Sequence, residues 1–154
     1  ARLKLLSQQL GRTARYELAD TTQAAAALVS TLTTLGTDPD SFQLGLGVYS
    51  AHVEVVVCQA GQWYAGHHAP ARTPEDAAYF VFRLLSDLGL ATDALTQWWL
   101  YGEGTDLRAY DLMATLLKLA PQRLNPLRAF GLPAQSGSPV QMAAYVPCVG
   151  AALV

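Results

Sequence analysis

Apolar residues recur at every second position within residues 42–48 and again from 53 to 57, which predicts β-strands. The segment "FQLGLGV" (42–48) has this period, "VEVVV" (53–57) repeats it, and "WYAGHH" (63–68) begins a third strand. The links between these segments are a few residues long, and such short links cannot support parallel crossovers. The pattern therefore predicts an antiparallel meander of three strands.

Helical spacing of apolar residues follows in "TPEDAAYFVFRLLSDLGL" (73–90). We expect Thr73 to cap this helix, Pro74 to take its first position and Gly89 to close it. Another helix is predicted ahead of the meander, in "QAAAALVSTLTTL" (23–35), where the preceding "DTT" offers side-chain caps. The meander is thus expected to lie between two helices.

The remaining segments alternate between helix and strand. We predict a strand "TQWWLY" (96–101), a helix "LRAYDLMATLLKLA" (107–120), an edge strand within residues 122–130, and short helices at 2–10 and from Pro147. This order predicts the α/β fold class. We expect a mixed sheet of parallel and antiparallel strands (α+β), with helices against its faces. The length of 154 residues fits a single domain. We assign residues 1–17 to an N-terminal helix or linker and 18–154 to that domain.

The composition points toward a protein partner and away from nucleic acid. The chain is 51% hydrophobic and 14% charged, whereas about 25% is the usual charged share. We expect an apolar surface patch that a partner covers, although an alanine-rich globule would have the same composition. The net charge is −2 and the ten Lys and Arg residues are scattered. No basic stripe therefore predicts binding to nucleic acid.

The two cysteines predict neither a zinc site nor a required disulfide. Cys58 and Cys148 lie far apart and in no metal-binding spacing. Cys58 falls within an apolar strand, where a free buried thiol is expected. A disulfide stays open as an alternative, but a reducing compartment is the simpler interpretation. No signal peptide is visible, and the apolar run "VQMAAYVPCVGAALV" (140–154) is too short to span a bilayer.

The histidines do not form an obvious metal site in the sequence. His67 and His68 adjoin on a strand, so they point to opposite faces and cannot easily bind one ion. His52 is the remaining histidine, and Glu54 alternates onto its face. From this pattern we expect no metal. Among the acidic residues, Glu103 is the best polar candidate, because no structural role is predicted for it.

Four aromatic residues are candidates for an interface, because Tyr and Trp supply much of the energy of protein binding. Adjacent tryptophans on a strand point to opposite faces. One can fill the core beneath a helix, and the other must lie under a second helix or meet a partner. Core packing on both faces is the alternative. The candidates are Trp63, Tyr64, Trp98 and Trp99.

Several stretches, taken in order, resemble the second half of the actin-like fold, which belongs to the ribonuclease H-like class. They are similar to PilM-type pilus assembly proteins and to a bacterial family of the same fold, in which a Thr-x-Glu-Asp helix start follows the hairpin. The resemblance covers residues 18–154, one half of a two-half fold. The stretches are "LADTTQAAAAL" (18–28), "LGLGVYSAHVEVVVCQAGQ" (44–62), "ARTPEDAAYFVFRLLSDLGL" (71–90), "WLYGEG" (99–104) and "YVPCVGAAL" (145–153).

The resemblance implies where a nucleotide would bind. Gly45 takes the place of the phosphate-loop aspartate, and Gly47 takes that of the family's glycine. Gly102, Glu103 and Gly104 correspond to the turn that contacts adenosine. Magnesium needs oxygen ligands, and glycine has no side-chain oxygen. This departure favours loss of hydrolysis. It also leaves open whether the glycines make room for a phosphate or for a neighbouring element packed against the strand.

We therefore expect a non-catalytic scaffold or protein-interaction domain of a degenerate actin-like protein, without a cofactor. Its partner would be another protein or the missing half of the same fold. The resemblance implies a cytoplasmic location, peripheral to the inner membrane where the partners form a membrane complex. One alternative is a nucleotide-binding ATPase or sugar-kinase-like enzyme that uses ATP with magnesium and whose other half is absent. Another is a small-ligand sensor.

Overall fold

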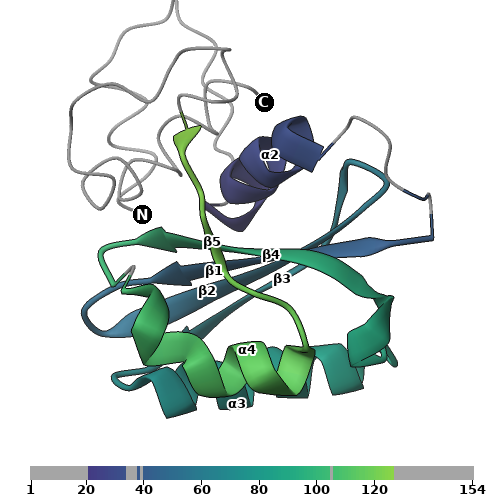
Figure 1. The fold of residues 1–154 in the computed structure, drawn as a ribbon. Helices are drawn as coiled ribbons and strands as arrows, with labels where there is room; N and C mark the ends of the chain where they lie inside the picture. Colours follow the sequence, from purple (N-terminus) through teal and green to yellow (C-terminus); the bar gives the residue numbers. More distant parts are fainter. Residues whose placement is uncertain (1–20, 34–37, 39, 105, 127–154) are drawn as a thin grey trace, which may run out of the picture.

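The computed structural model describes residues 21–33, 38, 40–104 and 106–126, and these form a layered α/β domain (Figure 1). The predicted helices at 2–10 and from Pro147 lie outside the described residues. The elements are α2 (Thr21–Thr33), β1 (Phe42–Val48), β2 (His52–Gln59), β3 (Gln62–Pro70), α3 (Pro74–Asp87), a 3₁₀ turn η1 (Thr92–Ala94), β4 (Leu95–Gly102), a 3₁₀ turn η2 (Leu107–Tyr110), α4 (Asp111–Leu117) and β5 (Gln122–Arg123).

The five strands form one mixed sheet in the order β3-β2-β1-β4-β5. The pairs β1–β2 and β2–β3 are antiparallel, as the short links predict, and a tight turn through Ala60 (φ 49°) and Gly61 (φ 75°) joins β2 to β3. β4 pairs with β1 in parallel, so β1 occupies the centre. The predicted meander and mixed sheet are confirmed.

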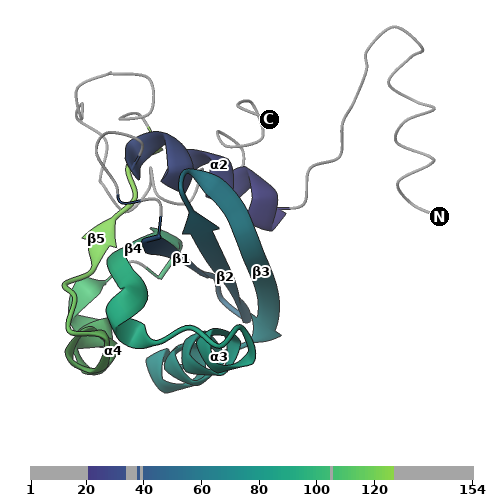
Figure 2. The ribbon, with the colours of Figure 1, turned by 90° about the vertical axis from the view of Figure 1, so that its right-hand side faces the viewer.

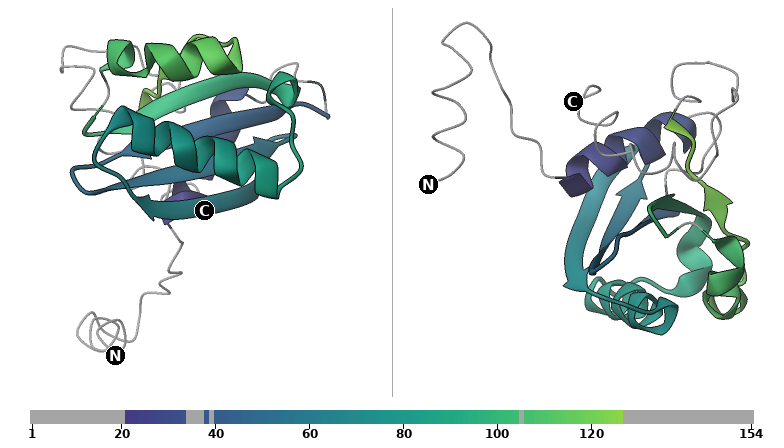
Figure 3. Two further views of the ribbon diagram at one scale, coloured as in Figure 1. Left: turned by 90° about the horizontal axis from the view of Figure 1, so that it is seen from below. Right: turned by 90° about the vertical axis from the view of Figure 1, so that its left-hand side faces the viewer.

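Helices cover both faces of the sheet (Figures 2 and 3). α2 lies on one face, here called the α2 face, and α3 and α4 lie side by side on the other. The alternation of side chains along each strand fills two cores. The core under α3 and α4 includes Leu44, Leu46, Val55, Val57, Trp98 and Leu100. The core under α2 includes Val29, Val56, Cys58, Trp99 and Tyr101.

The start of α3 carries the predicted capping signals. The Thr73 side chain accepts a hydrogen bond from the Asp76 amide at 3.1 Å, and the Asp76 carboxylate accepts one from the Thr73 amide at 3.2 Å. This capping box satisfies amides that the helix itself leaves unpaired. Backbone hydrogen bonds from Arg72 and then Thr73 lower the pKa of Asp76. At the other end Gly89 (φ 67°) lets the chain leave the helix.

The segment predicted as one helix over 107–120 is divided into η2 and the shorter helix α4. Asp106 caps the start of η2 by accepting a hydrogen bond from the Arg108 amide at 3.2 Å. Lys118 adopts a left-handed conformation (φ 56°) and ends the helix before Pro121. The turn that follows presents the Leu119 carbonyl to the indole nitrogen of Trp98 at 2.8 Å. The strand predicted within residues 122–130 is described as far as residue 126, and within that part only β5 (Gln122–Arg123) forms.

We predict that Thr73→Ala lowers the free energy of unfolding by about 1 kcal/mol, because it removes the acceptor for the Asp76 amide. Thr73→Ser keeps an oxygen at the same position and should remain close to the native protein. Urea denaturation followed by circular dichroism measures both variants. An equal loss in the two variants would show that the hydroxyl is not the source of the stability.

Candidate functional site

Parallel pairing of β1 with β4 brings the predicted nucleotide-binding residues together. In the register of the two strands Gly45 pairs with Trp99, Gly47 with Tyr101, and Val48 with Gly102. The turn after β4, which contains Glu103 and Gly104, therefore lies beside the end of β1. The structure thus gathers all five residues along one strand pair, although they come from segments more than fifty residues apart.

The two strand glycines make room for the ring of Tyr101. A β-carbon on Gly47 would lie 2.4 Å from Cε2 of Tyr101, far inside van der Waals contact. A β-carbon on Gly45 would lie 3.3 Å from a methyl group of Val29 and 3.4 Å from the Tyr101 ring. Tyr101 itself is fully buried. In this structure the close neighbour of the glycines is therefore a side chain of the domain itself.

The glycine turn after β4 wraps around the end of β1. The amides of Glu103 and Gly104 both donate to the carbonyl oxygen of Val48, at 2.7 and 3.1 Å. Gly102 has φ 91°, and a β-carbon there would lie 2.4 Å from the same oxygen. Only glycine fits this approach. The carboxylate of Glu103 is exposed to solvent.

The aromatic candidates fall into two groups. Trp98 is buried against α3 and α4, where its ring meets that of Tyr110, and Trp99 is buried on the α2 face. The two tryptophans thus point to opposite faces as expected, and both pack inside the domain. Trp63 and Tyr64 lie on β3, and each is 46% exposed. Of the four, these two remain at the surface.

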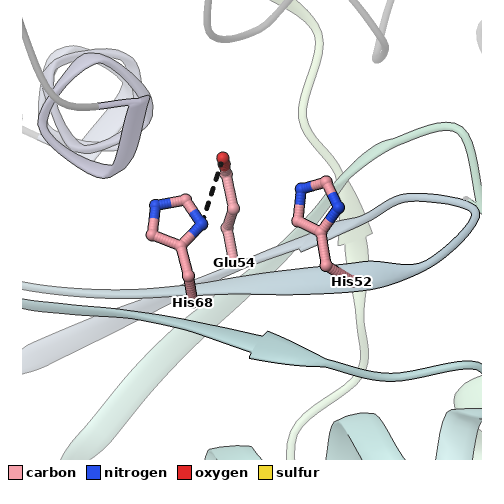
Figure 4. Close-up of side chains that lie close together, drawn as sticks. All are labelled: His52, Glu54 and His68. Atoms are coloured by element: carbon pink, nitrogen blue, oxygen red, sulfur yellow. Dashed lines mark ion pairs between the residues drawn. The ribbon is translucent and has the colours of Figure 1, made fainter. Parts of the chain in front are cut away.

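A polar cluster lies on the α2 face beside Gly47 (Figure 4). Glu54 pairs with Gly47 in the β1–β2 register and is only 3% exposed. Its carboxylate accepts a hydrogen bond from the Tyr101 hydroxyl at 3.2 Å and lies 3.7 Å from Nδ1 of His68. Burial, followed by the negative charge of Glu54, raises the pKa of Tyr101 well above its ordinary value. Tyr101 therefore keeps its proton and acts as a donor.

His52 completes this cluster, and its ring stacks on that of Tyr49 with centroids 4.7 Å apart. One ligand atom from each of His52, Glu54 and His68 lies within 4.8 Å of the others. His67, as predicted, turns to the opposite side, where its ring lies 6.1 Å from that of Phe80 on α3.

The sequence analysis missed this cluster because it tested only the adjacent histidines, His67 and His68, as a pair of ligands. Residues two apart on a strand share a face, which joins His52 to Glu54. The turn at Ala60 and Gly61 joins β2 to β3, and in the register of the two strands His68 lies opposite Glu54. A bulge between Val57 and Cys58 shifts that register, so counting back from the turn alone does not give the pairing.

Comparison with solved structures identifies the fold as actin-like. A Bacteroides thetaiotaomicron protein with an actin-like ATPase fold superposes with a TM-score of 0.61 at 14% identity, over 83% of this chain and 49% of that one. The PilM–PilN type IV pilus biogenesis complex superposes with a TM-score of 0.54 at 16% identity, over 85% of this chain and 51% of that one. The ethanolamine utilization protein EutJ from Carboxydothermus hydrogenoformans has a TM-score of 0.50 at 14% identity, over 87% of this chain and 53% of that one.

These similarities establish the fold alone, and the chain spans about half the length of the structures it matches. No protein family model matches the sequence, and no curated protein matches it. The predicted resemblance to one half of the actin-like fold is confirmed. Across the part of the chain that the structure describes, no helix is both long and apolar enough to cross a membrane.

We predict that Gly47→Ala lowers the free energy of unfolding by about 1–3 kcal/mol, because the new methyl group overpacks against the buried Tyr101 ring. The loss should be smaller in a Tyr101→Leu background, where the ring is absent. A double-mutant cycle measured by urea denaturation isolates this coupling. A Gly47→Ala variant as stable as the native protein would mean that the glycine is not needed for packing.

We also predict that the Cys58 thiol is unreactive in the folded protein. Burial raises its pKa to about 12, and the thiolate is the reactive form. In a Cys148→Ser variant, a chromogenic disulfide reagent at about pH 8 should label Cys58 only after urea is added. Rapid labelling without urea would contradict the observed burial.

Proposed function

We propose that this domain is a non-catalytic protein-binding scaffold of a degenerate actin-like protein. The observation that carries the proposal is the contact of β4 and its turn with β1. The ring of Tyr101 lies against Gly45 and Gly47, and the carbonyl of Val48 takes the amides of Glu103 and Gly104. The groups that could receive phosphate are thereby used by the domain itself.

The chemistry of the hairpin agrees with this role. A magnesium ion that accompanies a nucleotide takes oxygen ligands, and the loop between β1 and β2 (49–51) contains no acidic residue. The Glu54 carboxylate on β2 lies beside the nitrogen ligands of His52 and His68, whereas Mg²⁺ prefers oxygen ligands alone. These features favour binding of a macromolecule over phosphoryl transfer.

The surface proposed for the partner is the outer side of β3, at the edge of the sheet (Figure 2). Trp63 and Tyr64 are exposed there, and most of the strand is open to solvent. An edge strand offers backbone groups to a partner strand, and exposed Trp and Tyr act as anchors at interfaces. The PilM–PilN complex is a protein assembly with the same fold, which supports a protein as the partner.

The second candidate is a nucleotide-binding enzyme whose other half completes the site. The actin-like ATPase fold of the Bacteroides protein favours it, as does the half-length match. In that case Gly45, Gly47 and the turn of Gly102, Glu103 and Gly104 would line one wall, with ATP and magnesium as cofactors.

Titration of the protein in its full natural length with fluorescent ATP, with and without magnesium, separates the two candidates. The scaffold proposal predicts no saturable binding. Magnesium-dependent binding with a Kd on the order of 1 μM, lost on Gly47→Val, would overturn it in favour of the enzyme.

Site-specific photo-crosslinking in the source cells tests the proposed surface. A photoreactive amino acid at Trp63 or Tyr64 should form a covalent adduct with one defined polypeptide. The same amino acid at Tyr79, an exposed aromatic position on α3, is the matched control and should not. Equal adducts from all three positions, or none from β3, would contradict the assignment of the surface.

A further inference from the structure

Three side chains of metal-binding type converge on the α2 face at the open end of the β2–β3 pair. His52 and Glu54 are two residues apart on β2, and His68 is the cross-strand partner of Glu54 on β3. Alternation and register therefore give all three the same face. Their ligand atoms lie within 4.8 Å of one another, and Figure 4 shows the two imidazoles on either side of the carboxylate.

The buried carboxylate is the base of this cluster. Glu54 is 3% exposed, and a buried charge is costly unless it is paired or bound to a metal. Among the described residues, no Lys or Arg forms an ion pair with it, and Nδ1 of His68 lies 3.7 Å from its Oε1. That distance exceeds hydrogen-bond length. It is close to the separation of about 3.3 Å between two ligands of a tetrahedral ion with bonds of about 2.0 Å.

From this geometry we infer that His52, Glu54 and His68 form a binding site for a divalent transition-metal ion such as Zn²⁺. Two imidazoles and one carboxylate suit Zn²⁺ and related ions, whereas Mg²⁺ prefers oxygen alone. The two histidines are exposed and the glutamate is buried. The ion would therefore enter from solvent and keep its outward coordination positions for water or another ligand.

Tyr101 is the positioning residue of this site. Its hydroxyl donates to Oε2 of Glu54 at 3.2 Å, which leaves Oε1, the oxygen nearer His68, to face the ion. Such hydrogen bonds behind a ligand orient it and tune the affinity of the site. The stack of His52 on Tyr49 similarly fixes the plane of one imidazole.

The site is independent of the proposed scaffold function. Its ligands come from β2 and β3, and it needs neither a nucleotide nor a partner. A bound ion would join the two strands at the end where His52 pairs with Pro70. It would thereby stiffen β3, the strand proposed to receive the partner.

The test uses the full chain without an affinity tag, after treatment with a chelator. Calorimetric titration with Zn²⁺ should give about one equivalent bound, with a Kd on the order of 1 μM or tighter, in the presence of excess Mg²⁺. Co²⁺ should produce the visible absorption of an ion with nitrogen ligands. His52→Gln and His68→Gln should each weaken binding by at least about tenfold, and Tyr101→Phe by about tenfold.

His67→Gln is the matched control, because His67 adjoins His68 but lies on the opposite face, beside Phe80. It should bind Zn²⁺ like the native chain. Circular dichroism verifies that each variant is folded, and the exposed positions of His52 and His68 make this the expected result. Absence of saturable Zn²⁺ binding, or equal binding by the His68→Gln and His67→Gln variants, would overturn the inference.

Discussion

The contact on which the rest of the structure depends is that of the Tyr101 ring with the bare backbone of β1. Because Gly47 has no side chain, the ring lies across the central strand, and its hydroxyl reaches Glu54 on the far strand β2. One buried residue thus links β4, β1 and β2. It joins the parallel part of the sheet to the antiparallel meander and fills part of the core beneath α2.

The same contact connects the two proposals. With the ring in place, the face of β1 that could admit a phosphate is occupied, and the turn after β4 is tied to Val48. At the same time, the Tyr101 hydroxyl holds a buried carboxylate beside two histidines. We therefore propose that this end of the sheet offers nitrogen and oxygen ligands to a metal ion rather than backbone amides to a phosphate.

An actin-like fold does not by itself imply ATP hydrolysis, since function depends on the side chains of the site. The solved structures that this chain resembles share the fold at 14–16% identity. The described residues form a sheet with helices on both faces and an exposed edge strand, β3. The edge strand is the surface that we propose for association with another polypeptide, whether a separate protein or a second half of the same fold.

The sequence by itself determined the elements whose signals are local. Period-two alternation gave the strands, Thr73 with Pro74 and Gly89 gave α3, and short links gave the antiparallel meander. It also gave the opposite faces of Trp98 and Trp99. The helix predicted after Asp106 was too long. It ends at Lys118 in a left-handed conformation that no local sequence pattern indicated.

Only the tertiary structure decided what the glycines contact and which polar side chains meet. Both outcomes follow from pairings between segments distant in sequence, namely β1 with β4 and β2 with β3. The β2–β3 register depends on a bulge, and the side chain that meets Gly47 comes from a strand reached by a crossover. Periodicity records the face on which a residue lies, but the neighbour on that face is set by the packing of the whole sheet.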